Sequence, residues 1–197
     1  MIPDTTHNDP RRAAILTAAF ETFARYGFRR TAMEDIARAC NLSRASLYLH
    51  FQNKQDILRA LTAYYFDVTE TRMRAALQPG QKPKHALTAA FAAKLGPEVL
   101  ALLDSPHGAD ILNAETSSAP DLIAQGEARL IAALSDWLRI EAAYQRITLN
   151  PLGVDAPTLA QTMLAALKGL MAQAQDSDML RARAQALALL FARGLKP

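Results

Sequence analysis

Residues 31–54 read TAMEDIARACNLSRASLYLHFQNK, and the fold that the sequence predicts is built around this stretch. It opens with Thr31 and, three positions later, Glu34, a spacing typical of a capping box at the start of a helix. A short apolar stripe follows at helical spacing and ends near Cys40. Asn41 then stands where the chain must turn sharply, and asparagine tolerates the left-handed backbone of such turns. The pattern therefore predicts a short helix followed by a tight turn.

A second short helix is predicted from Arg44 to about His50, with Ser43 as its N-cap. Leu47 and Phe51 lie four residues apart, so both would face the interior. The other positions carry hydrogen-bond donors: Arg44, Ser46, Tyr48 and His50, followed by Lys54. Two short helices joined by a tight turn have the spacing of a helix-turn-helix, whose second helix enters the DNA major groove. Any helical hairpin shares that spacing, but an outer face of donors suits phosphates and base edges.

Longer helices are predicted on both sides of this motif. Asp9 as N-cap and Pro10 as the first helical residue begin a helix that Gly27 ends. Asn53 caps a helix that runs to about Leu77. Its length, about 36 Å at 1.5 Å per residue, exceeds what one small domain needs. We therefore expect this helix to bridge two bodies.

The composition predicts an all-α protein. Alanine fills 39 positions and leucine 28, whereas valine fills 3, and these proportions favour helices over strands. The segments predicted after the long helix are a breaker at 78–83, helices at 84–95 and 97–103, a loop-like or broken region at 105–118, a helix at 120–144, a loop at 150–153, and helices at 156–174 and 178–193. We expect a three-helix DNA-binding domain at residues 1–55, joined by the long helix to a larger helical domain at residues 56–197.

The positive charge of the chain is confined to its first third. Residues 1–59 contain nine Lys and Arg against six Asp and Glu, whereas residues 60–197 contain 13 of each. The whole net charge of +3 therefore belongs to the segment with the predicted helix-turn-helix. This asymmetry is expected of a module that meets a polyanion, and a chance basic surface would account for it equally well.

The same residues resemble the DNA-binding domain of TetR/AcrR-type transcriptional regulators. The resemblance covers roughly residues 10–60 and is carried by ILTAAF at 15–20, Phe23, Gly27, Thr31, Ile36, Ala37, LSRASLYLHF at 42–51, Asn53 and Lys54. Two positions depart from the commonest pattern, since Asn41 stands where glycine is usual and Ala45 where glycine is frequent. Asn41 keeps the chemistry of the turn, whereas the methyl group of Ala45 affects the base preference.

The resemblance implies a role for each matching position. Arg44 and Ala45 would contact base edges, with Arg44 bidentate to guanine. The residues that would mainly hold phosphates are Thr31, Ser46, Tyr48, His50 and Lys54. Some of these residues also have an explanation without DNA: Thr31 as a helix cap, Tyr48 as half-buried packing, and His50 and Lys54 as ordinary surface residues.

A homodimer is also implied by the resemblance, with two recognition helices about one DNA turn (34–36 Å) apart on a palindromic operator. We expect the dimer interface, called the seam below, on the last two helices. The residues predicted for it are Leu159, Met163, Leu167, Leu170, Leu180, Leu187, Leu190 and Phe191. The alternative is that these apolar stripes form the core of a single chain.

In such regulators, a small effector enters the helical core of the larger domain and moves the DNA-binding heads apart, which releases a repressor from its operator. The candidate pocket residues, chosen for bulk or a polar group, are Tyr64, Phe91, His107, Trp137 and Met163. An aromatic residue in a core is more often packing than a ligand contact. The zero net charge of residues 60–197 favours a mostly apolar effector. The sequence itself does not separate repression from activation.

Other classes of protein are disfavoured. The sequence contains no Glu-x-x-His, Gly-x-Ser-x-Gly, Walker or Gly-x-Gly-x-x-Gly motif, so we expect neither an enzyme nor a cofactor. The four histidines lie far apart with Cys40 isolated, so no metal site is expected. No stretch approaches the roughly 18 apolar residues of a membrane span, and the polar residues 1–10 do not resemble a secretory signal. We expect a cytoplasmic protein without membrane contact. The alternative function is an all-α small-molecule-binding protein with no specific DNA target.

Overall fold

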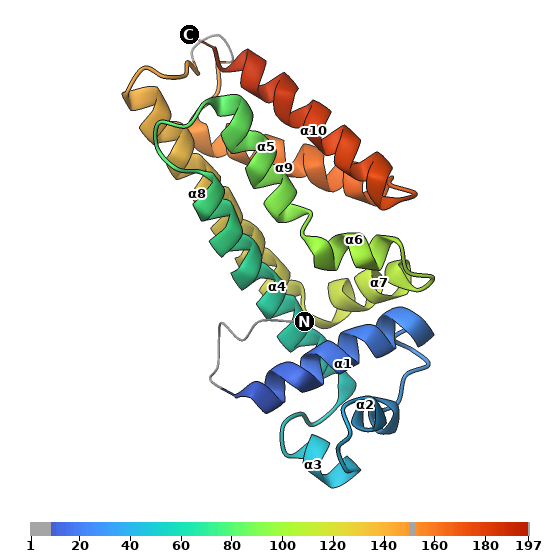
Figure 1. Ribbon diagram of the computed structural model, residues 1–197. Helices are drawn as coiled ribbons and strands as arrows, with labels where there is room; N and C mark the ends of the chain where they lie inside the picture. Colours follow the sequence, from blue (N-terminus) through green and yellow to red (C-terminus); the bar gives the residue numbers. More distant parts are fainter. Residues whose placement is uncertain (1–8, 150–152, 197) are drawn as a thin grey trace. The chain divides into compact units, whose positions relative to one another are not determined.

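The computed structural model describes residues 9–149 and 153–196, and the regular structure within them is entirely α-helical (Figure 1). This confirms the all-α prediction. The predicted loop at 150–153 lies, except for Gly153, outside the described residues. The helices are α1 (Pro10–Tyr26), α2 (Met33–Ala39), α3 (Arg44–Tyr48), α4 (Lys54–Ala76), α5 (Pro83–Lys94), α6 (Pro97–Leu103), α7 (Gly108–Ser118), α8 (Pro120–Ala143), α9 (Ala156–Ala172) and α10 (Ser177–Gly194).

Local capping places the ends of the first helices where the sequence predicts them. The Asp9 carboxylate accepts the Arg11 backbone N–H at 2.9 Å, and Gly27 ends α1 with a φ of 85°. Asn41 takes the left-handed backbone of the turn, with a φ of 54°. The Asn53 side chain accepts the Asp56 N–H at 2.8 Å, at the start of α4. Each of these interactions joins residues close in sequence, so they could be read from the sequence.

The prediction of a loop-like or broken region at 105–118 is wrong, because Gly108–Ser118 forms α7. Polar side chains of this segment form hydrogen bonds within the helix. The Thr116 hydroxyl, for example, donates to the Leu112 carbonyl at 2.9 Å. Ile111 is 2% exposed. Tertiary burial of an apolar side chain outweighs the weak helix propensity of serine, threonine and asparagine here.

The contacts divide the chain into two compact units. Unit 1 comprises the residues up to Val68 and Ala101–Gly126, and unit 2 comprises Thr69–Leu100 and the residues from Glu127 onward. Helix α4 contributes to both units, as expected of a bridging helix. A single boundary after residue 55 does not match this grouping, because Leu102 and Ile111 join the core formed by α1–α4. The extent of the DNA-binding domain itself stays a prediction.

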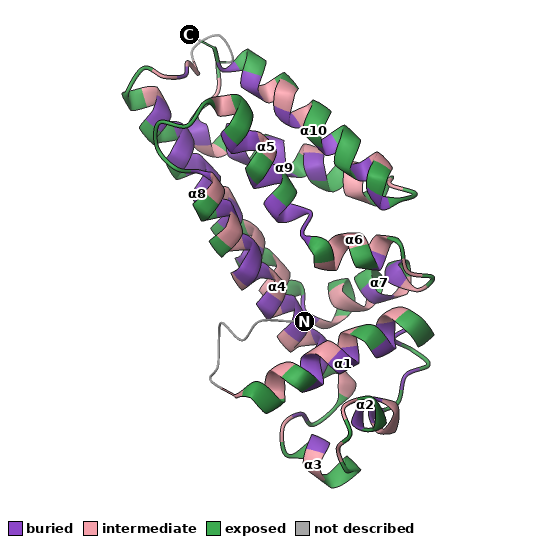
Figure 2. Cartoon of the chain, in the orientation of Figure 1, coloured by how far each residue is buried: buried purple, intermediate pink, exposed green. Residues whose placement is uncertain are grey.

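Unit 1 has one continuous apolar core. Its buried members come from α1–α4 and the segments between them, and are completed by side chains of α6 and α7. They are Ile15, Leu16, Ala19, Phe23, Phe28, Met33, Ile36, Ala37, Leu47, Phe51, Ile57, Leu58, Leu61, Leu102 and Ile111. The predicted inward positions of the helix-turn-helix are therefore confirmed, and Figure 2 shows the buried faces of these helices in purple.

Ion pairs and a close helix contact hold the later part of unit 1 on α4. Arg59 donates two hydrogen bonds of 2.7 Å to the Asp121 carboxylate and one of 2.9 Å to the Ser118 carbonyl. The Arg59 guanidinium lowers the pKa of Asp121 to about 2. Gly126 of α8 lies directly against the ring of Phe66, with no room for a Cβ atom.

In unit 2, α10 packs along α5 and α9, and a buried carboxylate at one end of α8 forms an ion pair with a partly exposed arginine. Glu141 is 0% exposed, accepts two hydrogen bonds of 2.7 and 2.8 Å from Arg146, and accepts the Gly80 N–H at 2.9 Å. The hydrogen bonds from Arg146 lower the pKa of Glu141, against the opposing effect of burial. The carboxylate thereby ties the predicted breaker segment to α8.

Within the described residues, no single helix combines the length and the hydropathy needed to cross a membrane; only α5 and α6 taken together across their break reach both.

Gly126→Ala is expected to lower the free energy of unfolding by about 1–3 kcal/mol, because the added methyl group would overlap the Phe66 ring. Urea denaturation followed by circular dichroism measures this change. Gly169→Ala is the matched control, since Gly169 is an exposed helical glycine with nothing within 4 Å of the added atom. The control is expected to stabilise by up to about 1 kcal/mol through helix propensity alone. Equal changes in both variants would contradict the close contact at Gly126.

Candidate nucleic-acid interface

Helix α3 has one buried side and one exposed side (Figure 2). Ser43 is its N-cap and accepts the Ser46 backbone N–H at 3.0 Å, as the sequence predicts. The hydroxyl groups of Ser43 and Ser46 are also hydrogen bonded to each other at 2.8 Å. Leu47 is 0% exposed and anchors the helix in the core of unit 1. The capping bonds and this anchor orient the opposite side toward solvent.

The exposed side of α3 carries Arg44, Ala45 and Tyr48, three of the predicted DNA contacts. The Arg44 guanidinium lies 5.5 Å from the centroid of the Tyr48 ring and 2.6 Å from a carboxylate oxygen of Glu34. A hydrogen bond with Tyr48 and the charge of Glu34 raise the pKa of Arg44. A cation and an aromatic donor thus share one exposed surface.

The sequence did not reveal one residue of this surface and one ion-pair partner of Arg44. Glu34, predicted only as part of a helix cap, is the ion-pair partner of Arg44 across the turn. Leu49, next to Tyr48, is 86% exposed, and an apolar side chain gives no reason to expect such exposure. Neither property has a local signal, because both depend on how α2 and α3 meet. We call Arg44, Ala45, Tyr48 and Leu49 the α3 surface.

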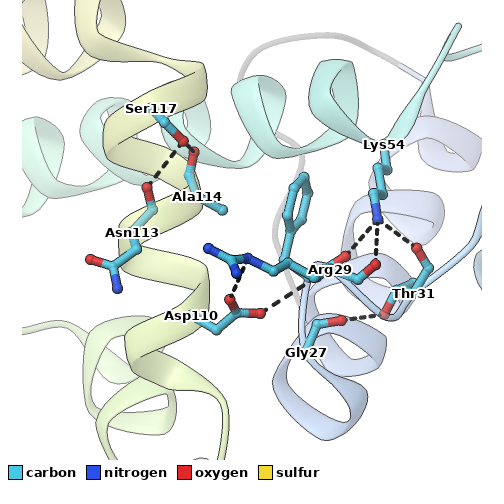
Figure 3. A network of polar contacts seen from close by, with 9 residues as sticks. Gly27, Arg29, Thr31, Lys54, Asp110, Asn113, Ala114 and Ser117 are labelled. Atoms are coloured by element: carbon cyan, nitrogen blue, oxygen red, sulfur yellow. Dashed lines mark hydrogen bonds and ion pairs between the residues drawn. The ribbon is translucent and has the colours of Figure 1, made fainter.

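Thr31 does not cap α2, so the predicted capping box is wrong. The N-cap is Ala32, whose backbone N–H donates to the Asp35 carboxylate at 2.9 Å. The Thr31 hydroxyl instead donates to the Gly27 carbonyl at 2.8 Å, and the residue is 2% exposed. The chain enters the helix one residue later than predicted because this bond keeps Thr31 in the preceding turn (Figure 3).

The Lys54 ammonium group is held inside unit 1. It donates three hydrogen bonds to backbone carbonyls, at 2.8 Å to Phe28, 3.0 Å to Arg29 and 2.9 Å to Thr31 (Figure 3). Burial lowers the pKa of Lys54, and the charge of Asp110 opposes that effect. Since an ammonium group has three N–H donors, a phosphate contact would require Lys54 to give up a carbonyl.

His50 and Arg12 meet at the end of α3. The His50 Nδ1 atom lies 3.5 Å from a carboxylate oxygen of Asp9, and the His50 carbonyl accepts a hydrogen bond of 3.2 Å from Arg12. The Arg12 guanidinium also lies 4.2 Å from the centroid of the Phe51 ring. The beginning of α1 therefore holds the end of α3, a role of Arg12 that the sequence analysis did not foresee.

Asp110 of α7 contacts the turn between α1 and α2, within unit 1 (Figure 3). Its carboxylate accepts the Arg29 backbone N–H at 3.4 Å and lies 3.6 Å from the Arg29 side chain. The sequence carries no local signal for this contact, because α7 is not among the predicted helices. Lys54 and Asp110 thus both form hydrogen bonds with the backbone of the turn before α2.

The five predicted pocket residues are divided between the units. Tyr64 and His107 belong to unit 1, whereas Phe91, Trp137 and Met163 belong to unit 2. All except His107 are buried. The indole N–H of Trp137 has no hydrogen-bond partner among the described residues. A buried, unpaired donor is unusual, and a ligand acceptor is one explanation for it.

The eight predicted seam residues differ in exposure. Leu159, Met163, Leu167 and Leu180 are buried within the single chain. Leu170, Leu187 and Phe191 are partly exposed, and Leu190 is 64% exposed. Phe191 also makes an edge contact with Phe91, with ring centroids 6.4 Å apart. Surface available to a second chain is thus concentrated on the second half of α10 and the end of α9.

Comparison with known proteins relates this unit to bacterial regulators. The profile described as "Bacterial regulatory proteins, tetR family" matches residues 15–61. The uncharacterized HTH-type transcriptional regulator YuxN of Bacillus subtilis (strain 168) is 32% identical over 72 residues, which is 36% of this chain and 25% of that protein. The HTH-type transcriptional repressor ComR of Escherichia coli (strain K12) is 27% identical over 110 residues, 56% of this chain and 52% of that protein.

These matches span between a quarter and about half of the length of the relatives named. The fold extends further: a TetR transcription regulator from Haloarcula marismortui ATCC 43049 superposes with a TM-score of 0.74 over 94% of this chain and 97% of that one, at 18% identity. At that identity the likeness establishes the fold alone. Residues 15–61 therefore match the tetR family of bacterial regulatory proteins, and the chain shares the fold of a TetR transcription regulator over most of its length.

Proposed function

We propose that the protein is a transcriptional repressor that binds a palindromic DNA operator as a homodimer and is released by a small effector. The observation that carries the proposal is the α3 surface, which presents Arg44 and Tyr48 to solvent while Leu47 anchors the same helix in the core. A helix so oriented can enter the major groove, where arginine pairs with guanine and apolar groups contact the thymine methyl group.

The distribution of charge along the chain also supports DNA binding by the helix-turn-helix. The net positive charge lies in residues 1–59, which contain α1, α2, α3 and the start of α4. In the free protein, Arg44 is paired with Glu34 at 2.6 Å. DNA binding would exchange this carboxylate for a base edge, so the ion pair competes with DNA and disfavours weak, non-specific contacts.

The dimer is supported by the exposed apolar side chains of α10 in unit 2. Leu190 is the most exposed of the predicted seam residues, and Leu187 and Phe191 on the same helix are partly exposed. A two-fold pair of such helices would bury them. The symmetry of the dimer would then match that of a palindromic operator.

The effector is proposed to bind in unit 2, against the unpaired indole N–H of Trp137. The surrounding helices are rich in alanine and leucine, so the ligand would be mostly apolar with one hydrogen-bond acceptor. Helix α4 contributes residues to both units and is the proposed lever. Ligand binding shifts the protein between two arrangements only if its affinity for them differs.

The salt dependence of DNA binding tests the proposed function. We expect the affinity of the full-length protein for duplex DNA to fall steeply with salt, because binding would release counterions from several phosphates. Fluorescence anisotropy at a series of salt concentrations gives the slope. A slope near zero would instead support the alternative, a small-molecule-binding protein with no DNA target.

Arg44→Ala is expected to weaken operator binding by about 1–3 kcal/mol and to relax the preference at one base pair. Binding to a set of operators with single substitutions measures both effects. Glu34→Gln is the matched control on the same contact, and it is expected to strengthen binding because it frees the guanidinium. If Arg44→Ala weakened binding to all sequences equally, the residue would not read a base.

Lys54→Met is expected to lower the free energy of unfolding by about 1–3 kcal/mol, because three carbonyls at the turn before α2 would lose their donor. Urea denaturation measures the loss. In DNA binding, we expect weaker affinity with an unchanged salt slope, as for a positioning residue. A decrease in the slope of about one would show that Lys54 contacts a phosphate directly.

A further inference from the structure

A surface pocket lies beside the helix-turn-helix, wholly within unit 1. Its cavity volume is about 700 Å³, and its walls come from the end of α1, the turn between α1 and α2, α2 itself, and the segment between α6 and α7. The charged and polar side chains that matter here are Arg25, Tyr26, Arg30, Asp35, Arg38 and His107. None of them belongs to the α3 surface.

The pocket carries an excess of positive charge. Its one carboxylate, Asp35, accepts the Ala32 N–H at 2.9 Å and lies 3.6 Å from Arg38, so these two side chains offset each other. Arg25 and Arg30 form no ion pair with any residue that the structure describes, and Arg25 only stacks on the ring of Tyr26 at 5.3 Å. Two guanidinium groups therefore remain uncompensated at one concave surface.

His107 closes the third side of the pocket. A Cβ atom on Gly27 would lie 3.3 Å from the Nδ1 atom of His107, so the imidazole packs against the end of α1. The same end of α1 is bound to Asp110 through Arg29. The wall is thereby attached to the turn before α2. A concave pocket with walls from several chain segments fits a small molecule better than the backbone of a duplex.

We propose that this pocket binds a small molecule carrying a phosphate or diphosphate group. Arginine presents a planar fork of donors that matches phosphate oxygens, and charge-assisted hydrogen bonds of this kind are strong. Arg25 and Arg30 would bind the anion, and the Tyr26 hydroxyl would supply a neutral donor. The site is separate from the apolar effector site proposed in unit 2. A bound anion would join the end of α1 to the turn before α2, and so stabilise unit 1.

Titration calorimetry of the full-length protein with inorganic pyrophosphate tests this proposal, without DNA and at an ionic strength held constant with chloride. We expect saturable binding to the wild-type protein. The double variant Arg25→Gln/Arg30→Gln is expected to bind about tenfold more weakly or worse, since it removes both forks. These side chains are exposed and unpaired, so the variant retains the fold, which its circular dichroism and Tm verify.

Arg183→Gln/Arg193→Gln is the matched control, because it removes the same charge from exposed positions of α10. It is expected to bind pyrophosphate like the wild type. An equal loss in both double variants, or no saturable binding by the wild type, would overturn the proposal.

A third outcome would also overturn it: no pyrophosphate binding, together with weaker binding of Arg25→Gln/Arg30→Gln to random duplex DNA and a smaller salt slope. The pocket would then hold the DNA backbone. Because the titration contains no DNA, its result does not depend on whether the protein binds an operator.

Discussion

The arrangement of the helix-turn-helix depends on one ammonium group bound to three backbone carbonyls. The residues between α1 and α2 leave their helices with carbonyl oxygens that no helical N–H can reach. Lys54, the first residue of α4, supplies three donors to them at once. The direction in which the chain enters α2, and with it the position of α3, follows from where α4 begins. Burial of the ammonium group lowers its pKa, which is the electrostatic cost of this arrangement.

Neighbouring contacts reinforce the same turn without using the same atoms. The Thr31 hydroxyl bonds to the Gly27 carbonyl, and the Asp110 carboxylate accepts the Arg29 N–H. The carbonyls of Gly27, Phe28, Arg29 and Thr31 therefore all accept hydrogen bonds from within unit 1. The α3 surface is different, because Arg44 is held by exposed contacts with Glu34 and Tyr48 that a competing partner can replace. Several contacts within unit 1 thus hold the turn, whereas the contacts of the α3 surface are exposed to solvent.

The sequence predicted those parts of the fold whose causes lie within a few residues. Asp9, Asn41, Ser43 and Asn53 act on neighbours in the chain, and the structure places all four as expected. Thr31 misled the capping argument because a second acceptor, the Gly27 carbonyl, competes for its hydroxyl. Helix α7 was missed because its stability comes from burying Ile111, and local propensity carries no information on burial.

Within the candidate site, the sequence identified which residue types matter but not their partners. It selected Arg44 and Lys54, yet the Glu34 carboxylate and the three carbonyls are contacts between segments that only the fold brings together. The division of the chain shows the same limit. Leu102 and Ile111 belong to the core of the N-terminal helices, although more than fifty residues separate them from α3.

That core has a consequence for how the protein is made. Helices α1 to α3 leave the ribosome well before Leu102 and Ile111, which complete the apolar cluster around them. At a synthesis rate of about 5–20 residues per second, the helix-turn-helix waits on the order of several seconds with part of its core open to water. The segment that matches the family, residues 15–61, therefore contains the helix-turn-helix but lacks two side chains of the apolar core around it.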